Sequence, residues 1–77
     1  MKTKKIGEAW LIRLDTGEPV VASLQAFCGK EKIRAAAVTG IGTCRNPTLA
    51  FFDWDKKAYH ARTLTGDFEI TGLAGNV

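Results

Sequence analysis

The sequence predicts an α+β domain, in which a mainly antiparallel sheet of about five strands packs against one helix. Three observations support this fold class. Five short segments rich in apolar, β-branched and aromatic residues are separated by turn residues, which is typical of strands. One further segment carries apolar residues at helical spacing. The connections between the strand segments are short, and short connections favour antiparallel neighbours.

The chain is small, and its size limits the core that it can build. Its 77 residues make at most one domain, and a domain of this length buries only about 60% of its unfolded surface. Hydrophobic residues make up 45% of the sequence and charged residues 25%, which is ordinary for a folded protein. We therefore expect a folded domain that needs partners to complete its core.

The first predicted strand covers residues 8–14 and follows an N-terminal tail, residues 1–7. Trp10 and Ile12 lie on one face by simple alternation, and Leu11 lies on the other. Because both faces are largely apolar, we expect this strand to be central in the sheet.

The predicted helix covers residues 19–31, after a turn at residues 15–18. Pro19 suits the first helical position, where its missing N–H would have no partner. The spacing i, i+1, i+4, i+7, i+8 describes one apolar stripe, formed by Val20, Val21, Leu24, Phe27 and Cys28.

A small-residue strand at residues 35–39 is expected to end in a glycine loop. Gly40 and Gly42 permit backbone conformations that a Cβ would forbid, and we assign them a role in loop geometry. A turn is predicted at Asn46 and Pro47, because the residue before a proline avoids helical angles.

The last three predicted strands cover residues 48–54, 58–65 and 68–73, with a hairpin turn at residues 55–57. The first of them is apolar on both faces. In the second, Tyr59 and Leu64 are candidate core residues, whereas His60 and Arg62 share the other face.

The order of these segments, together with their glycine motifs, resembles one known family. The string VTGIGT at residues 38–43, the strand that follows it and GDFEITGLAGN at residues 66–76 resemble the PPC domain, also called DUF296. This domain is found in prokaryotes, and in plants it is joined to AT-hook DNA-binding motifs. The resemblance runs from about Trp10 to the last residue.

The resemblance implies several further properties. The fold would be a PPC-like, acetolactate decarboxylase-like barrel over residues 8–77, incomplete at its C-terminal end, because family members continue with further strands and a His-containing segment. Family members form trimers, so a homo-trimer is implied. The stretch implicated in partner interaction in plant members corresponds here to Gly66, Phe68, Glu69, Ile70 and Gly72. Glu69 either points to solvent or sits in a cleft with a raised pKa, and simple alternation favours solvent.

The charge pattern permits DNA binding without indicating it strongly. The net charge is +3, and no basic run exceeds two residues. The densest groupings include Lys2, Lys4 and Lys5 near the N-terminus. Possible contacts to DNA phosphates are Lys30, Lys32, Arg34, Arg45, Lys56 and Lys57. Because solvated termini, turns and helix ends explain these residues more simply than DNA binding does, we expect any DNA binding to be weak and not sequence-specific.

The residues of reactive type do not assemble into a catalytic or metal site. His60 is the only histidine, and no metal-ligand spacing surrounds it. Cys28 is expected to pack in the helix stripe, and Cys44 is the better candidate for an exposed thiol. We predict no enzyme activity, no cofactor and no metal. No apolar segment is long enough to span a bilayer, so we predict a cytoplasmic protein without membrane association.

Three functions remain compatible with the sequence. The first, which we favour, is a non-catalytic module that self-associates and takes part in DNA-associated or regulatory assemblies. The second is a metal-dependent, enzyme-like small-molecule protein whose His-rich metal segment is missing here. The third is a partial domain that only oligomerises.

Overall fold

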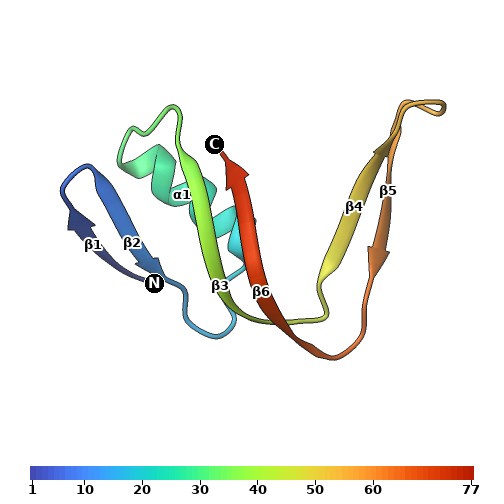
Figure 1. Cartoon of the computed structure of the whole chain (residues 1–77), viewed down its shortest axis with the longest axis horizontal. Helices are drawn as coiled ribbons and strands as arrows, with labels where there is room; N and C mark the ends of the chain where they lie inside the picture. The colour runs from blue at the N-terminus through green and yellow to red at the C-terminus, as the bar shows by residue number, and fades with distance from the viewer. The chain divides into compact units, whose positions relative to one another are not determined.

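The computed structural model describes all 77 residues and contains six strands and one helix (Figure 1). The elements are β1 (Lys2–Ile6), β2 (Ala9–Arg13), α1 (Val20–Lys30), β3 (Ala37–Arg45), β4 (Thr48–Asp53), β5 (Ala58–Thr63) and β6 (Asp67–Asn76). The α+β class with mainly antiparallel strands is confirmed. The strands do not join into one sheet of about five, however, because they form three two-stranded sheets, β1–β2, β3–β6 and β4–β5.

The chain divides into two compact units. The first contains Met1–Ala37 together with Asn76–Val77, and the second contains Val38–Gly75. In the first unit, Ala36 and Val77 exchange both backbone hydrogen bonds, at 3.3 and 2.9 Å. An exchange of this kind is typical of an antiparallel pair.

The first unit begins with a hairpin that the sequence did not predict. β1 occupies most of the expected N-terminal tail and pairs with β2 from Lys2 opposite Arg13 to Ile6 opposite Ala9. The two residues between the strands are Gly7 and Glu8, and Gly7 has a φ of 60°. Glycine with positive φ at the first turn position matches a type II′ hairpin turn, whose twist suits the flanking strands.

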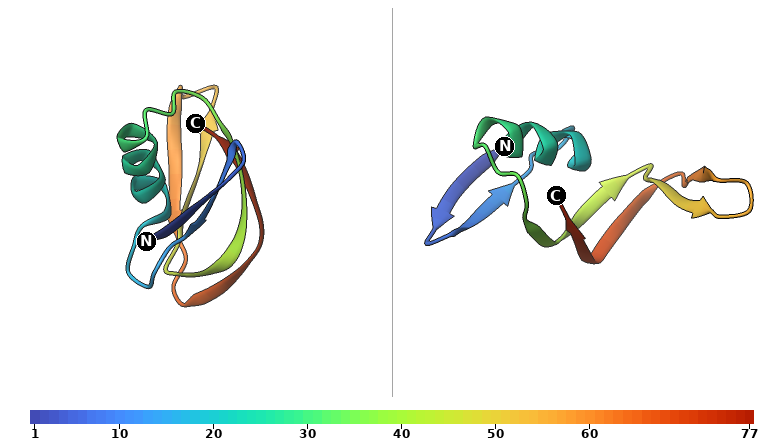
Figure 2. Two further views of the ribbon diagram at one scale, coloured as in Figure 1. Left: turned by 90° about the vertical axis from the view of Figure 1, so that its left-hand side faces the viewer. Right: turned by 90° about the horizontal axis from the view of Figure 1, so that it is seen from above.

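β2 is not the central strand that its two apolar faces led us to expect. Its only neighbour is β1, and Leu11 on its outer face is 61% exposed. The inner face carries Trp10, whose ring meets Phe27 of α1 edge to face at 5.1 Å. Figure 2 shows α1 lying along one side of this hairpin.

The helix α1 confirms the predicted amphipathic segment. Phe27 and Cys28 are its buried residues, and Val21 of the same stripe is 68% exposed. Pro19 is the N-cap rather than the first helical residue, and its carbonyl accepts the Ser23 N–H at 3.0 Å.

The helix ends in a Schellman motif. The Ile33 N–H donates to the Cys28 carbonyl at 2.8 Å, and the Lys32 N–H donates to the Gly29 carbonyl at 3.3 Å. Lys32 holds the left-handed position with a φ of 57°. Glycine is the usual residue at that position.

The second unit consists of two ladders that follow one another. β4 and β5 form an antiparallel hairpin from Thr48 opposite Thr63 to Asp53 opposite Ala58, which confirms the turn predicted at residues 55–57. This hairpin lies in sequence between β3 and β6, which pair with each other.

Between the two ladders, hydrogen bonds bridge the predicted Asn46–Pro47 turn. The Asn46 N–H donates to the Gly66 carbonyl, and the Gly66 N–H donates to Asn46 Oδ1, both at 2.8 Å. The Leu64 N–H donates to the Pro47 carbonyl at 2.9 Å. The backbone therefore stays paired where the strands change partners.

The glycine loop expected at Gly40 and Gly42 is absent. β3 continues from Ala37 to Arg45 through both glycines. Gly42 has a φ of 156°, so it keeps the chain in the strand with an angle that residues with a side chain rarely adopt. Glycine content alone favours a break, but pairing with β6 holds the segment extended.

Candidate interaction surfaces

Large apolar side chains are more often exposed than buried in this structure. The buried residues are only Phe27 and Cys28, both in α1. The exposed large hydrophobic residues are Met1, Ile6, Leu11, Val21, Ile41, Leu49, Phe51, Trp54, Tyr59, Phe68 and Val77. Where such side chains lie next to one another, they are candidates for surfaces that bind other molecules.

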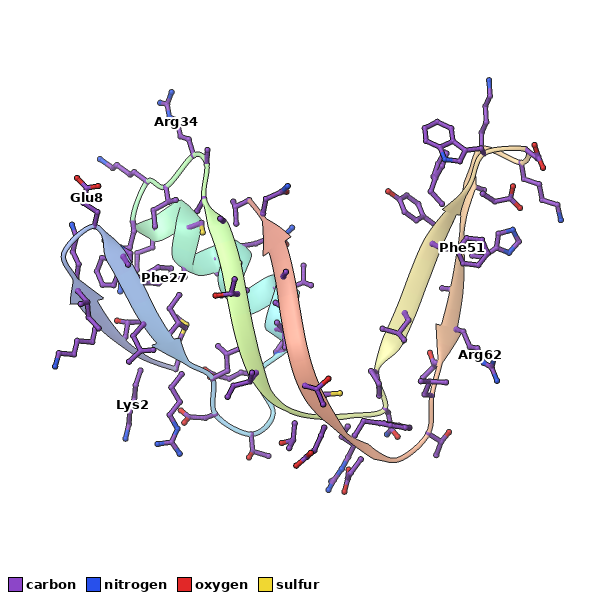
Figure 3. All side chains as sticks on the ribbon, in the orientation of Figure 1. Lys2, Glu8, Phe27, Arg34, Phe51 and Arg62 are labelled. Carbon is purple, nitrogen blue, oxygen red and sulfur yellow. The ribbon has the colours of Figure 1, made fainter.

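The β4–β5 hairpin exposes aromatic rings on both faces. Tyr59 is 74% exposed and meets Phe52 edge to face at 5.2 Å on one face. Phe51, labelled in Figure 3, is 65% exposed on the other. Tyr59 is therefore not the core residue that its position in the sequence suggested. We call β4, β5 and their turn, residues 48–63, the aromatic hairpin.

The aromatic hairpin also gives His60 a partner that the sequence analysis missed. Phe51 lies opposite His60, and their rings stack at 5.3 Å with an angle of 16° between planes. His60 Nε2 lies 3.0 Å from Asp53 Oδ2. The other oxygen of Asp53 accepts the backbone N–H groups of Asp55 and Lys56 at 2.9 and 3.2 Å. Asp53 thus holds the turn and orients the imidazole, a pairing that only the hairpin register reveals.

The residues of reactive type do not gather into a metal centre. No group of three or more His, Cys, Asp or Glu residues has a geometry that would hold a metal ion. Cys28 is buried, as predicted, and Cys44 is half-buried rather than exposed. The structure also contains no helix with the length and apolar character needed to cross a bilayer.

The residues that correspond to the partner-interaction stretch of plant family members lie at the start of β6. Gly66 precedes β6, and the other four, Phe68, Glu69, Ile70 and Gly72, lie within it. Phe68 is 40% exposed. Glu69 is exposed and lines a shallow, open depression together with Ile41 and Ile70. This surface offers apolar contact and one carboxylate, and its role in partner binding stays a prediction.

The six basic residues named as possible phosphate contacts are divided equally between the two units. Lys30, Lys32 and Arg34 lie in the first unit, at the end of α1 and in the segment after it; Arg45, Lys56 and Lys57 lie in the second. Within the second unit, Arg45 precedes the open end of the aromatic hairpin and the two lysines occupy its turn.

One of these residues, Arg45, is already paired. Its Nε–H donates to Asp67 Oδ1 at 2.7 Å, and an Nη–H donates to Asp67 Oδ2 at 3.4 Å. Both side chains are more than two-thirds exposed, so the pair contributes little to stability. It does, however, neutralise the charge that a phosphate contact would use.

A second basic group combines lysines of the N-terminal grouping with Arg13, which the sequence analysis did not place beside them. The register of the β1–β2 hairpin places Lys2 opposite Arg13 and Lys4 opposite Leu11. By alternation these residues share the face opposite to Trp10, and all four are exposed. The lysines near the N-terminus were visible in the sequence, but without β1 there was no reason to bring them next to Arg13.

The N-terminal ammonium joins β1 to the segment after β2. It donates to Asp15 Oδ2 at 3.0 Å and to Glu18 Oε1 at 2.8 Å. The hydrogen bond to Glu18, followed by that to Asp15, raises the pKa of the ammonium. The same bond, followed by the Asp15 backbone N–H, lowers the pKa of Glu18.

Comparison with known proteins identifies the family. The chain matches the crystal structure of a "putative DNA binding protein" from Bacteroides thetaiotaomicron with a TM-score of 0.91 and 35% sequence identity. The match covers 97% of this chain and 52% of the other, so the chain spans about half the length of that relative. No curated protein matches significantly. The family model of the Plants and Prokaryotes Conserved (PCC) domain matches residues 1–77. The chain therefore belongs to the PCC domain family, the family that its sequence resembles.

Proposed function

We propose that this chain is a non-catalytic cytoplasmic module that self-associates and takes part in DNA-associated assemblies. Family membership supports a DNA-associated role, as does the description of the Bacteroides protein as a "putative DNA binding protein". The basic residues named from the sequence would supply weak contacts to phosphates, Arg45 only by exchanging its partner Asp67 for a phosphate. A homo-trimer is the assembly that we expect.

One observation carries the self-association: the aromatic hairpin is exposed on both faces. An isolated two-stranded hairpin is marginally stable in water, because it has no third strand or helix to cover a face. Phe51, Trp54 and Tyr59 are 65%, 81% and 74% exposed. Burying a large apolar side chain contributes about 1.5–3 kcal/mol, so covering these rings with copies of the chain stabilises the hairpin and the assembly together.

Sedimentation velocity over a range of concentrations tests this role of the hairpin. We expect the unmodified chain to sediment as an oligomer, and the Phe51→Ser, Tyr59→Ser double variant to shift strongly toward monomer. Lys56→Ser, which changes a polar residue in the same hairpin, is the control and should leave the distribution unchanged. A double variant that associates as well as the unmodified chain would refute an interface on this hairpin.

The DNA-associated role is tested separately by gel shifts on duplex DNA at several salt concentrations. Weak binding that weakens steeply with added salt supports it, because phosphate contacts release counterions. Absence of any shift at low salt contradicts it.

Elemental analysis tests the metal-dependent alternative. Zinc that copurifies in a fixed ratio to protein would favour that alternative over the non-catalytic module.

A further inference from the structure

The outer face of the β1–β2 hairpin concentrates positive charge. Lys2 and Arg13 are directly opposite each other, and opposite residues of an antiparallel pair have Cβ atoms about 5 Å apart. Lys4 lies on the same face two residues along β1, a rise of about 7 Å. We call Lys2, Lys4 and Arg13 the basic face; Figure 3 labels Lys2 on it.

No acidic side chain forms an ion pair with the basic face. The carboxylates that follow β2, Asp15 and Glu18, are both bound to the N-terminal ammonium. Like charges directly opposite each other destabilise a strand pair. The fold therefore holds three cations together at a cost in stability that an anionic partner would remove.

The hairpin also has a form suited to one kind of anion. A two-stranded β-ribbon fits the major groove of duplex DNA. α1 lies on the opposite side, where Trp10 contacts Phe27, so the basic face is the side that α1 leaves open (Figure 2). Its remaining side chains are apolar or small, among them Ile6, Ala9 and Leu11. It has no Asn or Gln, the side chains that read adenine edges, and its three cations match the charge of phosphates.

We propose that the basic face binds the phosphate backbone of duplex DNA without sequence preference. This inference rests on the proposed DNA-associated function and adds a contact surface different from the six residues named from the sequence. Three phosphate contacts per chain should contribute about 2.7 to the magnitude of the slope of log affinity against log salt, at about 0.9 per contact.

The test measures duplex binding by fluorescence anisotropy against salt concentration. The variant carries Lys2→Gln, Lys4→Gln and Arg13→Gln together, and we expect its salt slope to be smaller in magnitude by about 2.7. The matched variant, Lys30→Gln, Lys32→Gln, Arg34→Gln, removes the same charge from the end of α1 and should reduce the slope by less. Because the first variant removes repulsion between exposed residues, we expect it to keep the circular dichroism spectrum of the unmodified chain.

The outcomes separate the two proposals. If the unmodified chain does not bind DNA, both fail. If it binds DNA and the basic-face variant binds with the same slope, only this inference fails. Should that variant not fold, amide NMR shifts on adding duplex to the unmodified chain decide: shifts in Lys2–Ile6 and Ala9–Arg13 support the inference, and their absence refutes it. The basic-face variant and the unmodified chain are also compared on anionic lipid vesicles. If the variant loses binding to vesicles as much as to DNA, a surface specific for DNA is refuted.

Discussion

At the scale of single residues, the junction between the two ladders depends on Asn46 and Gly66. Both have positive φ, 47° and 118°, and they exchange two hydrogen bonds of 2.8 Å. Asparagine tolerates the left-handed region better than most residues, and glycine enters positive φ freely. These two residues allow β3 to lead into β4, and β5 into β6, without leaving backbone groups unpaired.

Gly66→Ala should therefore destabilise the chain. A Cβ at this position would meet Phe68 at 4.0 Å, an ordinary contact, so the cost arises from the backbone angle and not from a clash. We expect a loss of about 1–2 kcal/mol in the free energy of unfolding by urea. Gly75→Ala is the control, because Gly75 has open space and no positive φ; it should be neutral or slightly stabilising. Equal effects of the two substitutions would contradict the argument.

The bond between Met1 and Glu18 predicts a specific pH dependence. The pKa of Glu18 is lowered, so its contribution to stability is present above the ordinary carboxyl range and is lost as pH falls through the lowered pKa. The pKa of the ammonium is raised, so its contribution is present below its ordinary pKa and is lost as pH rises through the raised one. Carbon NMR titration of the Glu18 carboxyl should show the lowered pKa, and acetylation of the N-terminus should return it toward its ordinary value. A titration that acetylation leaves unchanged would exclude the bond in solution.

At the scale of elements, the helix was predictable and most strand boundaries were close. The apolar stripe from Val20 to Cys28 follows helical spacing. The Schellman motif ends the helix just after this stripe, close to the predicted end. The turn at residues 55–57 was also predictable, because polar residues separate two apolar runs. These elements depend on local pattern, which one sequence contains.

The elements that were missed depend on pairing instead. β1 is rich in lysine and shows no apolar alternation, so only β2 beside it makes it a strand. β3 passes through two glycines because β6 holds it. For the same reason the partner of His60 could not be found by spacing alone, since Asp53 lies seven residues away across a hairpin. Long-range pairing is the information that local patterns lack.

The end of α1 offers a test at this scale. Lys32 occupies a left-handed position with a φ of 57°. This conformation is unfavourable for a residue with a Cβ and is not unfavourable for glycine. Lys32→Gly should raise the free energy of unfolding by about 0.5–1 kcal/mol. Lys30→Gly, two residues earlier at the last position of the helix, should lower it by up to about 1 kcal/mol. The opposite order of stabilities would show that the helix does not end as described.

At the scale of the whole molecule, the family of the chain was predictable from its sequence. The surfaces of the molecule were predictable only in part. The glycine motifs of residues 38–43 and 66–76 indicated the PCC family, which the family model and the Bacteroides structure show. The small core was expected from length, and the structure limits it to Phe27 and Cys28. The distribution of exposed rings over both faces of the aromatic hairpin required the register.

Self-association requires that this chain cover its exposed apolar surface with copies of itself. Light scattering coupled to size exclusion measures the mass directly. We expect a multiple of the 8.4 kDa chain mass, about 25 kDa for the proposed trimer. A folded species of 8.4 kDa that persists as concentration rises would contradict the claim.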